Sequence, residues 1–134
     1  MIYEHILDGN KKFNTNTVDI VRSGFTCDPE TINKVVIIAP VWKPDLFSNY
    51  LDSIDQISDG MYKIWNMSIK GKKITYIITG IGAPCLMDAI LALGCTPCEK
   101  IIFIGSVGGL GKNINIGDIV IPEYSICGDG ACRY

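Results

Sequence analysis

The sequence predicts an α/β fold with a mixed, largely parallel sheet that is flanked by helices. Two continuous β-branched runs, in KVVIIAP at 34–40 and KIIFIG at 100–105, are typical of strands buried on both faces of a sheet. Segments with helical spacing and a hairpin signal lie between these runs. This order of strands and helices is typical of an open sheet with parallel members.

Residues 1–30 are polar and mixed, and their DGNKKFNTNT stretch is typical of a loop, so we expect an N-terminal arm or an edge segment there. We expect the α/β domain at 31–134, and its first strand at 34–40 ends at a proline. Residues 44–54 predict a helix with Pro44 near its start. The apolar face of that helix would contain Leu46, Phe47, Tyr50, Leu51 and Ile54.

The following segments predict a hairpin, a helix and two further strands. Residues 62–80 contain two strand-like runs around a Lys-Gly turn. A short helix follows, with Pro84 near its first turn and Gly94 at its end. The buried strand at 100–104 leads into a glycine-rich turn, and GDIVIP at 117–122 predicts one more strand.

Composition limits the classes of partner. With 134 residues the chain is long enough for one domain with a core. A formal net charge of -2 offers neither the neutralisation of phosphates that nucleic acids require nor a polybasic membrane anchor. No apolar run reaches membrane-spanning length, and the N-terminal residues lack the apolar core of a secretory signal. We therefore expect no nucleic-acid partner, no membrane partner and a location in the cytoplasm.

The six cysteines include a C-x-x-C formed by Cys95 and Cys98. Because no secretory signal precedes them, we expect reduced thiols rather than a disulfide framework. A zinc site would need two further ligands, and the single histidine, His5, is distant in the sequence. We expect no metal site, and we expect the thiols to serve in packing, Cys127 and Cys132 included.

Three loops at the carboxyl ends of the predicted strands are candidates for a binding site: APVWKPD, TGIGAP and GSVGG. Gly80 and Gly82 precede a helix, whose free N–H groups and dipole favour an anion. Gly105 is followed by Ser106, whose hydroxyl can donate to a phosphate or a ribose oxygen. Each glycine alone is also explained by a tight turn, but two such loops at neighbouring strand ends favour a site for a phosphate or a sugar.

Several common catalytic motifs do not fit. GSVGGLG is neither the G-x-G-x-x-G of dinucleotide-binding folds nor a phosphate-binding loop with its Lys-Ser/Thr pair. The sequence contains no G-x-S-x-G elbow, and its single histidine near the N-terminus gives a Ser-His-Asp triad no support. A nicotinamide enzyme is therefore not expected.

Taken together, ITYIITGIGAPCLMDAI, KIIFIGSVGGLGKNINIGDIVIPE and ICGDGACRY resemble segments of the nucleoside phosphorylase/nucleosidase superfamily, which includes purine nucleoside and uridine phosphorylases. The resemblance covers about 35–134 and rests on the combination of motifs, since each alone would be weak. It implies a phosphorylase/hydrolase-like fold and the transfer of a ribosyl group from a base to phosphate or water. The expected partners are a nucleoside and phosphate, with phosphate as a co-substrate and no cofactor.

The resemblance also implies roles for individual residues. Gly82 is similar to the family's phosphate-side glycine, and Ser106 to the hydroxyl residue that contacts phosphate and ribose. Gly105 would keep the same turn open. Lys43 is the one cation in the first loop, and it is either a point charge for the phosphate or a solvated side chain.

Departures from the family pattern leave open whether phosphate or water accepts the ribosyl group. Phosphorylases commonly have an arginine at the position of Phe103, whereas hydrolytic members are uncharged there and often read GSxGG, as this chain does. Asp45, however, is not an obvious match for the glutamate that activates water in hydrolytic members of the methylthioadenosine type. We expect a phosphorylase-like pentosyltransferase with phosphate as the acceptor, and hydrolysis by a nucleosidase is the alternative.

The last residues predict that the chain is one portion of a larger fold. Cys132 stands where the family usually has serine, and Asp129 and Arg133 are charged residues near the expected site or in a solvated turn. The sequence stops at Tyr134, inside what should still be sheet. We therefore expect the N-terminal portion of an enzyme, or a truncated, non-catalytic relative that binds phosphate or a nucleoside. No catalytic residue is assigned, and the half-covered sheet predicts a homo-oligomer.

Overall fold

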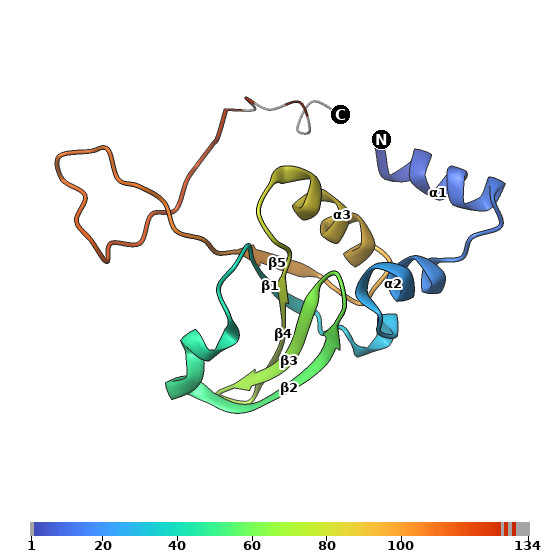
Figure 1. Cartoon of the computed structure of the whole chain (residues 1–134), viewed down its shortest axis with the longest axis horizontal. Coiled ribbons are helices and arrows are strands. Elements are labelled where there is room, and N and C mark those ends of the chain that lie inside the picture. The colour runs from blue at the N-terminus through green and yellow to red at the C-terminus, as the bar shows by residue number, and fades with distance from the viewer. Residues whose placement is uncertain (1, 127, 129, 131–134) are drawn as a thin grey trace.

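The structure, a computed structural model, describes residues 2–126, 128 and 130 and is built around one five-stranded sheet (Figure 1). The strands lie in the order β2-β3-β4-β1-β5 across the sheet. Their bounds are Val35–Ala39 for β1, Leu51–Asp59 for β2, Lys63–Ile69 for β3, Lys72–Ile78 for β4 and Lys100–Phe103 for β5.

β1 is the central strand of the parallel part of the sheet. It pairs in parallel with β4 on one side and with β5 on the other. β2, β3 and β4 form an antiparallel meander. Residues 36–39 of β1 are buried, and alternate side chains enter the cores on the two faces of the sheet. The predicted mixed sheet and its buried first strand are therefore confirmed.

The predicted hairpin and the helix after it are also confirmed. The turn between β3 and β4 consists of Lys70 and Gly71, with φ values of 50° and 72°. Two successive positive φ values are typical of the type I′ turn, whose twist suits a two-residue hairpin. α3 (Ala83–Leu93) follows β4, with Pro84 in its first turn and Gly94 at its C-cap.

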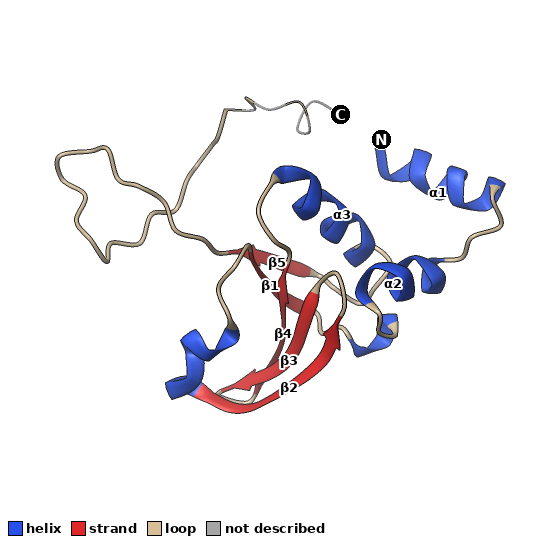
Figure 2. Cartoon of the chain, viewed as in Figure 1, coloured by secondary structure: helices blue, strands red, loops and turns tan. Residues whose placement is uncertain are grey.

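Different helices cover the two faces of the sheet (Figure 2), and each face has its own cluster of buried side chains. α2 (Thr17–Phe25) and α3 pack on one face, against buried side chains of β1, β3 and β4. The 3₁₀ helix η2 (Pro44–Tyr50) lies against the other face, where Phe47 contacts a smaller cluster around Tyr76. α1 (Ile2–Lys12) and the short 3₁₀ helix η1 (Pro29–Thr31) complete the described elements.

The N-terminal segment is more ordered than its polar composition predicts. The prediction of a loop at residues 8–17 is wrong in part, because α1 continues to Lys12 and α2 begins at Thr17. The Asn16 side chain caps α2 by accepting a hydrogen bond from the N–H of Asp19 at 2.8 Å. Phe25 is fully buried at the end of α2, and its ring meets that of Tyr62 edge-on at 5.5 Å.

The prediction of a single helix at 44–54 is wrong. Pro44 begins a helix as predicted, but that helix is a 3₁₀ helix and ends at Tyr50, and β2 begins at Leu51. The physical reason is the antiparallel pairing of β2 with β3, in which Ile54 lies opposite Met67. Helical spacing of apolar residues cannot reveal a partner strand that follows later in the chain.

Two expectations about the C-terminal third are wrong as well. β5 forms, but it is an edge strand, and Ile101, Ile102 and Phe103 are exposed because no described residue pairs with its outer edge. The strand expected at 117–122 does not form; this segment belongs to a long loop that leaves the sheet after β5 (Figure 1). A strand requires a neighbour, and within the described residues this segment has none.

The described cysteines are Cys27, Cys85, Cys95 and Cys98, and no disulfide joins any two of them. Burial raises the pKa of both Cys27 and Cys98, which disfavours their reactive thiolate form. Within the described residues, no three His, Cys, Asp or Glu side chains gather as metal ligands would. No helix in this part of the chain has the length and apolar character needed to cross a membrane.

We predict that Phe25→Ala lowers the free energy of unfolding by about 3–5 kcal/mol, because it opens a cavity where α2 meets the sheet and removes the contact with Tyr62. Urea unfolding followed by circular dichroism measures this change.

Phe13→Ala is the matched control, since Phe13 is 76% exposed in the same N-terminal segment. That variant should stay within about 0.5 kcal/mol of the parent. Equal, small effects of the two substitutions would mean that α2 is not part of the core.

Candidate functional site at the carboxyl edge of the parallel strands

The carboxyl ends of β4, β1 and β5 lie side by side at one edge of the sheet. In register, Ala39 is opposite Ile78, and Ile38 is opposite Phe103. The pairing continues just past the strands, because the N–H of Ile104 donates to the carbonyl oxygen of Ile38 at 2.9 Å. The three loops that the sequence singles out therefore begin at one edge, with the loop after β1 between the other two.

The loop after β4 leads directly into the N-terminus of α3. Gly80 and Gly82 have φ values of 81° and 116°, so both adopt conformations that residues with a side chain rarely enter. Gly82 is the N-cap of α3, and among the described residues no side chain accepts a hydrogen bond from the first turn. The first turn also holds no acidic residue. Pro84 has no N–H, but the remaining N–H groups that precede the first intrahelical hydrogen bond, together with the helix dipole, are thus available to an anion.

The contrast with α2 shows that an uncapped start is not general in this chain. At the N-terminus of α2, the Asn16 side chain occupies one of the free N–H groups, and Asp19 supplies a carboxylate to the first turn. These are the groups that usually satisfy a helix N-terminus. α3 has neither, and a bound anion would take their place.

Tyr76 holds the loop after β1 in place. Its hydroxyl donates a hydrogen bond to the carbonyl oxygen of Trp42 at 2.9 Å, and its ring meets that of Phe47 edge-on at 6.0 Å. Pro44, the residue after Lys43, is buried. The backbone on both sides of Lys43 is thereby fixed, while the Lys43 side chain is exposed at the edge of the sheet.

Sequence reasoning did not single out Tyr76 or Thr79. Burial raises the pKa of Tyr76 to about 12, and the negative charge of Asp45 adds to this effect. Thr79 is buried at the end of β4; its N–H donates to the carbonyl oxygen of Ala39 at 3.1 Å, and its hydroxyl donates to that of Gly80. The sequence offered one signal for these two residues, the presence of a tyrosine and a final threonine in the otherwise largely aliphatic run ITYIIT.

The loop after β5 carries Gly105 and Ser106, and both are exposed. A Cβ at Gly105 would lie 3.7 Å from the ring of Phe103, an ordinary contact, so packing within the described chain does not require a glycine there. Packing does require one at Gly109, where a Cβ would lie 2.7 Å from a methyl carbon of Ile114. The chain turns at 111–114, where the N–H of Ile114 donates to the carbonyl oxygen of Gly111 at 3.2 Å, and the bare Gly109 leaves room for the Ile114 side chain.

The structure thus brings Gly82, Gly105, Ser106 and Lys43 to one edge, on three loops. It does not enclose them: the two hollows described on the surface, about 270 and 250 Å³ in volume, contain no residue of these loops in their walls. The proposed contacts of the four residues with phosphate and ribose stay predictions. Asp129, Cys132 and Arg133 lie outside the described residues.

Comparison with known proteins identifies the family. A sequence model of the Phosphorylase superfamily matches residues 35–134. The chain belongs to this superfamily. The match begins at the first residue of β1 and includes all three loops of the site, whereas α1 and α2 precede it.

Relatives in the phosphorylase superfamily have two kinds of activity in their names. The chain is 34% identical over 87 residues to the 5′-methylthioadenosine/S-adenosylhomocysteine nucleosidase of Listeria innocua, a match that covers 63% of this chain and 37% of the relative. It is 26% identical over 104 residues to the uridine phosphorylase of Klebsiella aerogenes, covering 78% of this chain and 37% of the relative. The matches therefore span little more than a third of the length of these relatives.

Solved structures agree with this assignment. The uridine phosphorylase of Vibrio fischeri superimposes with a TM-score of 0.54 at 28% identity, over 61% of this chain and 35% of that one. The purine nucleoside phosphorylase of Toxoplasma gondii has a TM-score of 0.51 at 24% identity, a likeness of fold alone. The predicted family and its α/β fold are confirmed.

We predict that Tyr76→Phe lowers the free energy of unfolding by about 1 kcal/mol at neutral pH, because the carbonyl oxygen of Trp42 loses its donor. Above pH 10, a tyrosine ionises in the unfolded chain, whereas Tyr76 stays neutral in the folded chain up to about pH 12. The free energy of unfolding of the parent should therefore fall as the pH rises from 10 to about 12, and that of the Tyr76→Phe protein should fall less. Urea unfolding at a series of pH values measures both effects.

Tyr50→Phe is the control, since Tyr50 is 65% exposed in the same η2 region and makes no hydrogen bond through its hydroxyl in the described structure. It should match the parent at neutral pH. A Tyr76→Phe protein with unchanged stability would show that the hydroxyl does not anchor the loop.

Proposed function

We propose that this chain carries the phosphate- and ribose-binding edge of a nucleoside phosphorylase-like pentosyltransferase. In the proposed reaction a phosphate oxygen bonds to C1′ of the ribosyl group while the bond from C1′ to the base nitrogen breaks. The base leaves with the bonding electron pair and takes up a proton. Such a reaction requires donors that hold the anionic nucleophile beside a sugar that gains positive charge.

The observation that supports this proposal most directly is the start of α3. Gly82, with a φ of 116°, leads into a first turn that contains no carboxylate and that no side chain caps in the described part of the chain. An arrangement of this kind suits a phosphate. It lies at the same edge of the sheet as the ends of β1 and β5, and this shared edge would let Ser106 donate to the same phosphate or to a ribose hydroxyl.

Lys43 is proposed as the cation of this site. It is the N-cap residue of η2, and its carbonyl oxygen accepts a hydrogen bond from the N–H of Leu46 at 3.3 Å. Its backbone is therefore fixed while its side chain is free to reach a ligand. An ammonium group would add a point charge to the neutral donors of the loops after β4 and β5.

Hydrolysis by water is the second candidate, and Phe103 favours it. This residue ends β5 beside Gly105, where its side chain supplies no charge for a phosphate. The nucleosidase relative from Listeria innocua, at 34% identity, agrees with this reading. In that case the loops after β4 and β5 would hold the ribose and the attacking water, and phosphate would not accelerate the reaction.

We also propose that the protein assembles with copies of itself. The outer edge of β5 is unpaired in the described structure, and Ile101, Ile102 and Phe103 on this strand are exposed. The other edge strand, β2, is interrupted by two register shifts and carries Asp52, Asp55 and Asp59, features that oppose edge-to-edge pairing. The contrast between the two edges supports an interface beside β5.

The test is the release of free base from uridine and from 5′-methylthioadenosine, with and without phosphate, by the protein at its natural length. The proposal predicts that release depends on phosphate and that the sugar is recovered as its 1-phosphate. Release that is equally fast without phosphate would instead identify a nucleosidase. No release from any nucleoside would contradict both, and would leave a relative that only binds.

In the active protein, Ser106→Ala should lower kcat/KM about tenfold, the effect of one lost hydrogen bond to a charged group. Ser53→Ala is the matched control, because Ser53 is an exposed serine on β2, the strand at the far edge of the sheet. Equal activity of the two variants would remove Ser106 from the site.

A further inference from the structure

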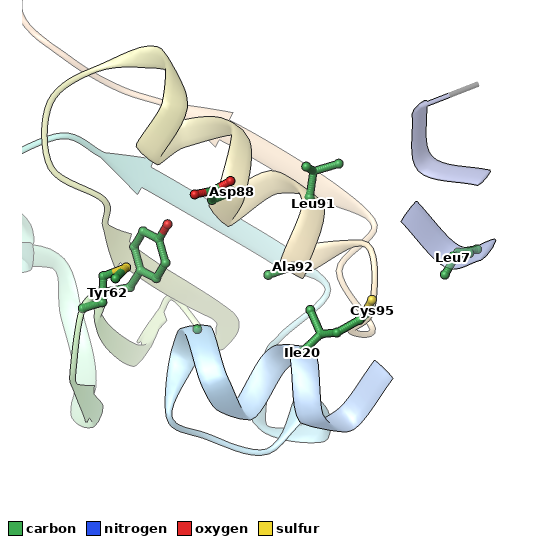
Figure 3. A pocket seen from close by; sticks show the side chains of 9 residues that line it. Leu7, Ile20, Tyr62, Asp88, Leu91, Ala92 and Cys95 are labelled. Atoms are coloured by element: carbon green, nitrogen blue, oxygen red, sulfur yellow. The ribbon is translucent and has the colours of Figure 1, made fainter. Parts of the chain in front are cut away.

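One of the two hollows mentioned above is a cavity on the helical side of the sheet, apart from the candidate site (Figure 3). Its volume is about 270 Å³. Its walls come from α1, α2, α3, the loop after α3 and the turn between β2 and β3: Leu7, Ile20, Gly24, Met61, Tyr62, Asp88, Leu91, Ala92 and Cys95. The contributions from α1 and α2 precede the residues that match the superfamily, and no residue of the three loops takes part.

The cavity has an apolar body and one polar end. Ile20, Leu91 and Ala92 form much of the body, and Figure 3 shows Tyr62 and Asp88 together at one end, with Cys95 toward the other. The negative charge of Asp88 helps to raise the pKa of Tyr62, after the larger effect of burial, which agrees with their proximity.

Both groups at the polar end are hydrogen-bond acceptors. The Tyr62 hydroxyl donates its proton to the carbonyl oxygen of Cys85 at 3.2 Å, so only its oxygen lone pairs face a ligand. The Asp88 carboxylate has neither an ion-pair nor a hydrogen-bond partner within the described part of the chain. A ligand that satisfies this end must donate hydrogen bonds and is favoured by a positive charge.

We propose that this cavity binds a small organic cation with an ammonium head and an apolar body about the size of one aromatic ring. The ammonium group donates to Asp88 and to the hydroxyl oxygen of Tyr62, and the apolar body packs against Ile20, Leu91 and Ala92. Charge complementarity at one end and apolar surface at the other select this class over anions and over sugars.

Phenethylammonium is a suitable probe, and 2-phenylethanol is its neutral match of nearly the same shape. For a ligand of this size, the expected dissociation constant is about 1 mM. The alcohol should bind about fivefold more weakly, because an exposed carboxylate contributes only modestly to an ion pair. Titration of the full-length chain, followed through the NMR signals of the Met61 methyl group and the Tyr62 ring, measures both constants.

Two substitutions test the location. Asp88→Asn keeps the shape of the side chain, and it should abolish the preference for the ammonium probe over the alcohol. Gly24→Leu should weaken both probes at least tenfold, since a Cβ at Gly24 meets nothing within 4 Å and the larger side chain would extend into the cavity. Gly9→Leu is the control: Gly9 is also helical and unhindered, but it does not line the cavity.

The proposal is supported if the ammonium probe binds saturably, Gly24→Leu weakens it and Gly9→Leu does not, with all variants giving the circular dichroism spectrum of the parent. Equal affinities for the ammonium and the alcohol would overturn it. So would unchanged binding to the Gly24→Leu protein, or the absence of saturable binding at tens of millimolar probe.

Discussion

The parallel pairing of β1 with both β4 and β5 is the constraint on which the rest of the structure depends. Because the three strands point the same way and their registers end within one residue of each other, three loops that are distant in the sequence start at one edge. Everything in the candidate site follows from this alignment. The hydrogen bonds from Thr79 to Ala39 and from Ile104 to Ile38 extend the pairing into the loops, so their first residues are as well fixed as the strands.

The two faces of the sheet support this edge in different ways. On one face, α3 packs its Ala89 and Leu93 against the sheet and presents its N-terminus at the edge. On the other face, Tyr76 reaches from β4 to the carbonyl oxygen of Trp42 and holds the loop that carries Lys43. Rigid supports of this kind limit the conformational entropy that a ligand must remove on binding. Of the two helices that precede the superfamily match, α2 contributes Val21 and Phe25 to the core on the α3 side. The cavity on this side lies where both helices meet the matched domain.

The elements that could be predicted from sequence are those with local signals. The run of β1, the Lys70-Gly71 turn and the proline at the start of α3 each depend on neighbouring residues only, and each appears as predicted. The errors concern elements that depend on distant partners. Leu51 and Ile54 fit a helical face, but pairing with β3 makes them part of a strand. The residues of β5 and 117–122 are mostly apolar, but their burial depends on neighbours that the described chain does not supply. In the candidate site, the glycine loops could be predicted from the sequence. The hydrogen bond by which Tyr76 holds the loop after β1 could not, because it links two residues that are 34 positions apart.

The central claim is that the aligned loops bind phosphate, and a titration of the full-length chain with inorganic phosphate tests it most directly. Backbone amide NMR signals would be followed for Gly82, Ala83 and Ser106 at the edge. Gly71 is the control, because it lies in the β3–β4 turn, at the end of β4 that is away from the candidate site. The account predicts saturable shifts at the first three and none at Gly71, since only the edge combines free N–H groups with a helix N-terminus. Shifts at Gly71 equal to those at the edge, or none that saturate at the edge, would contradict it.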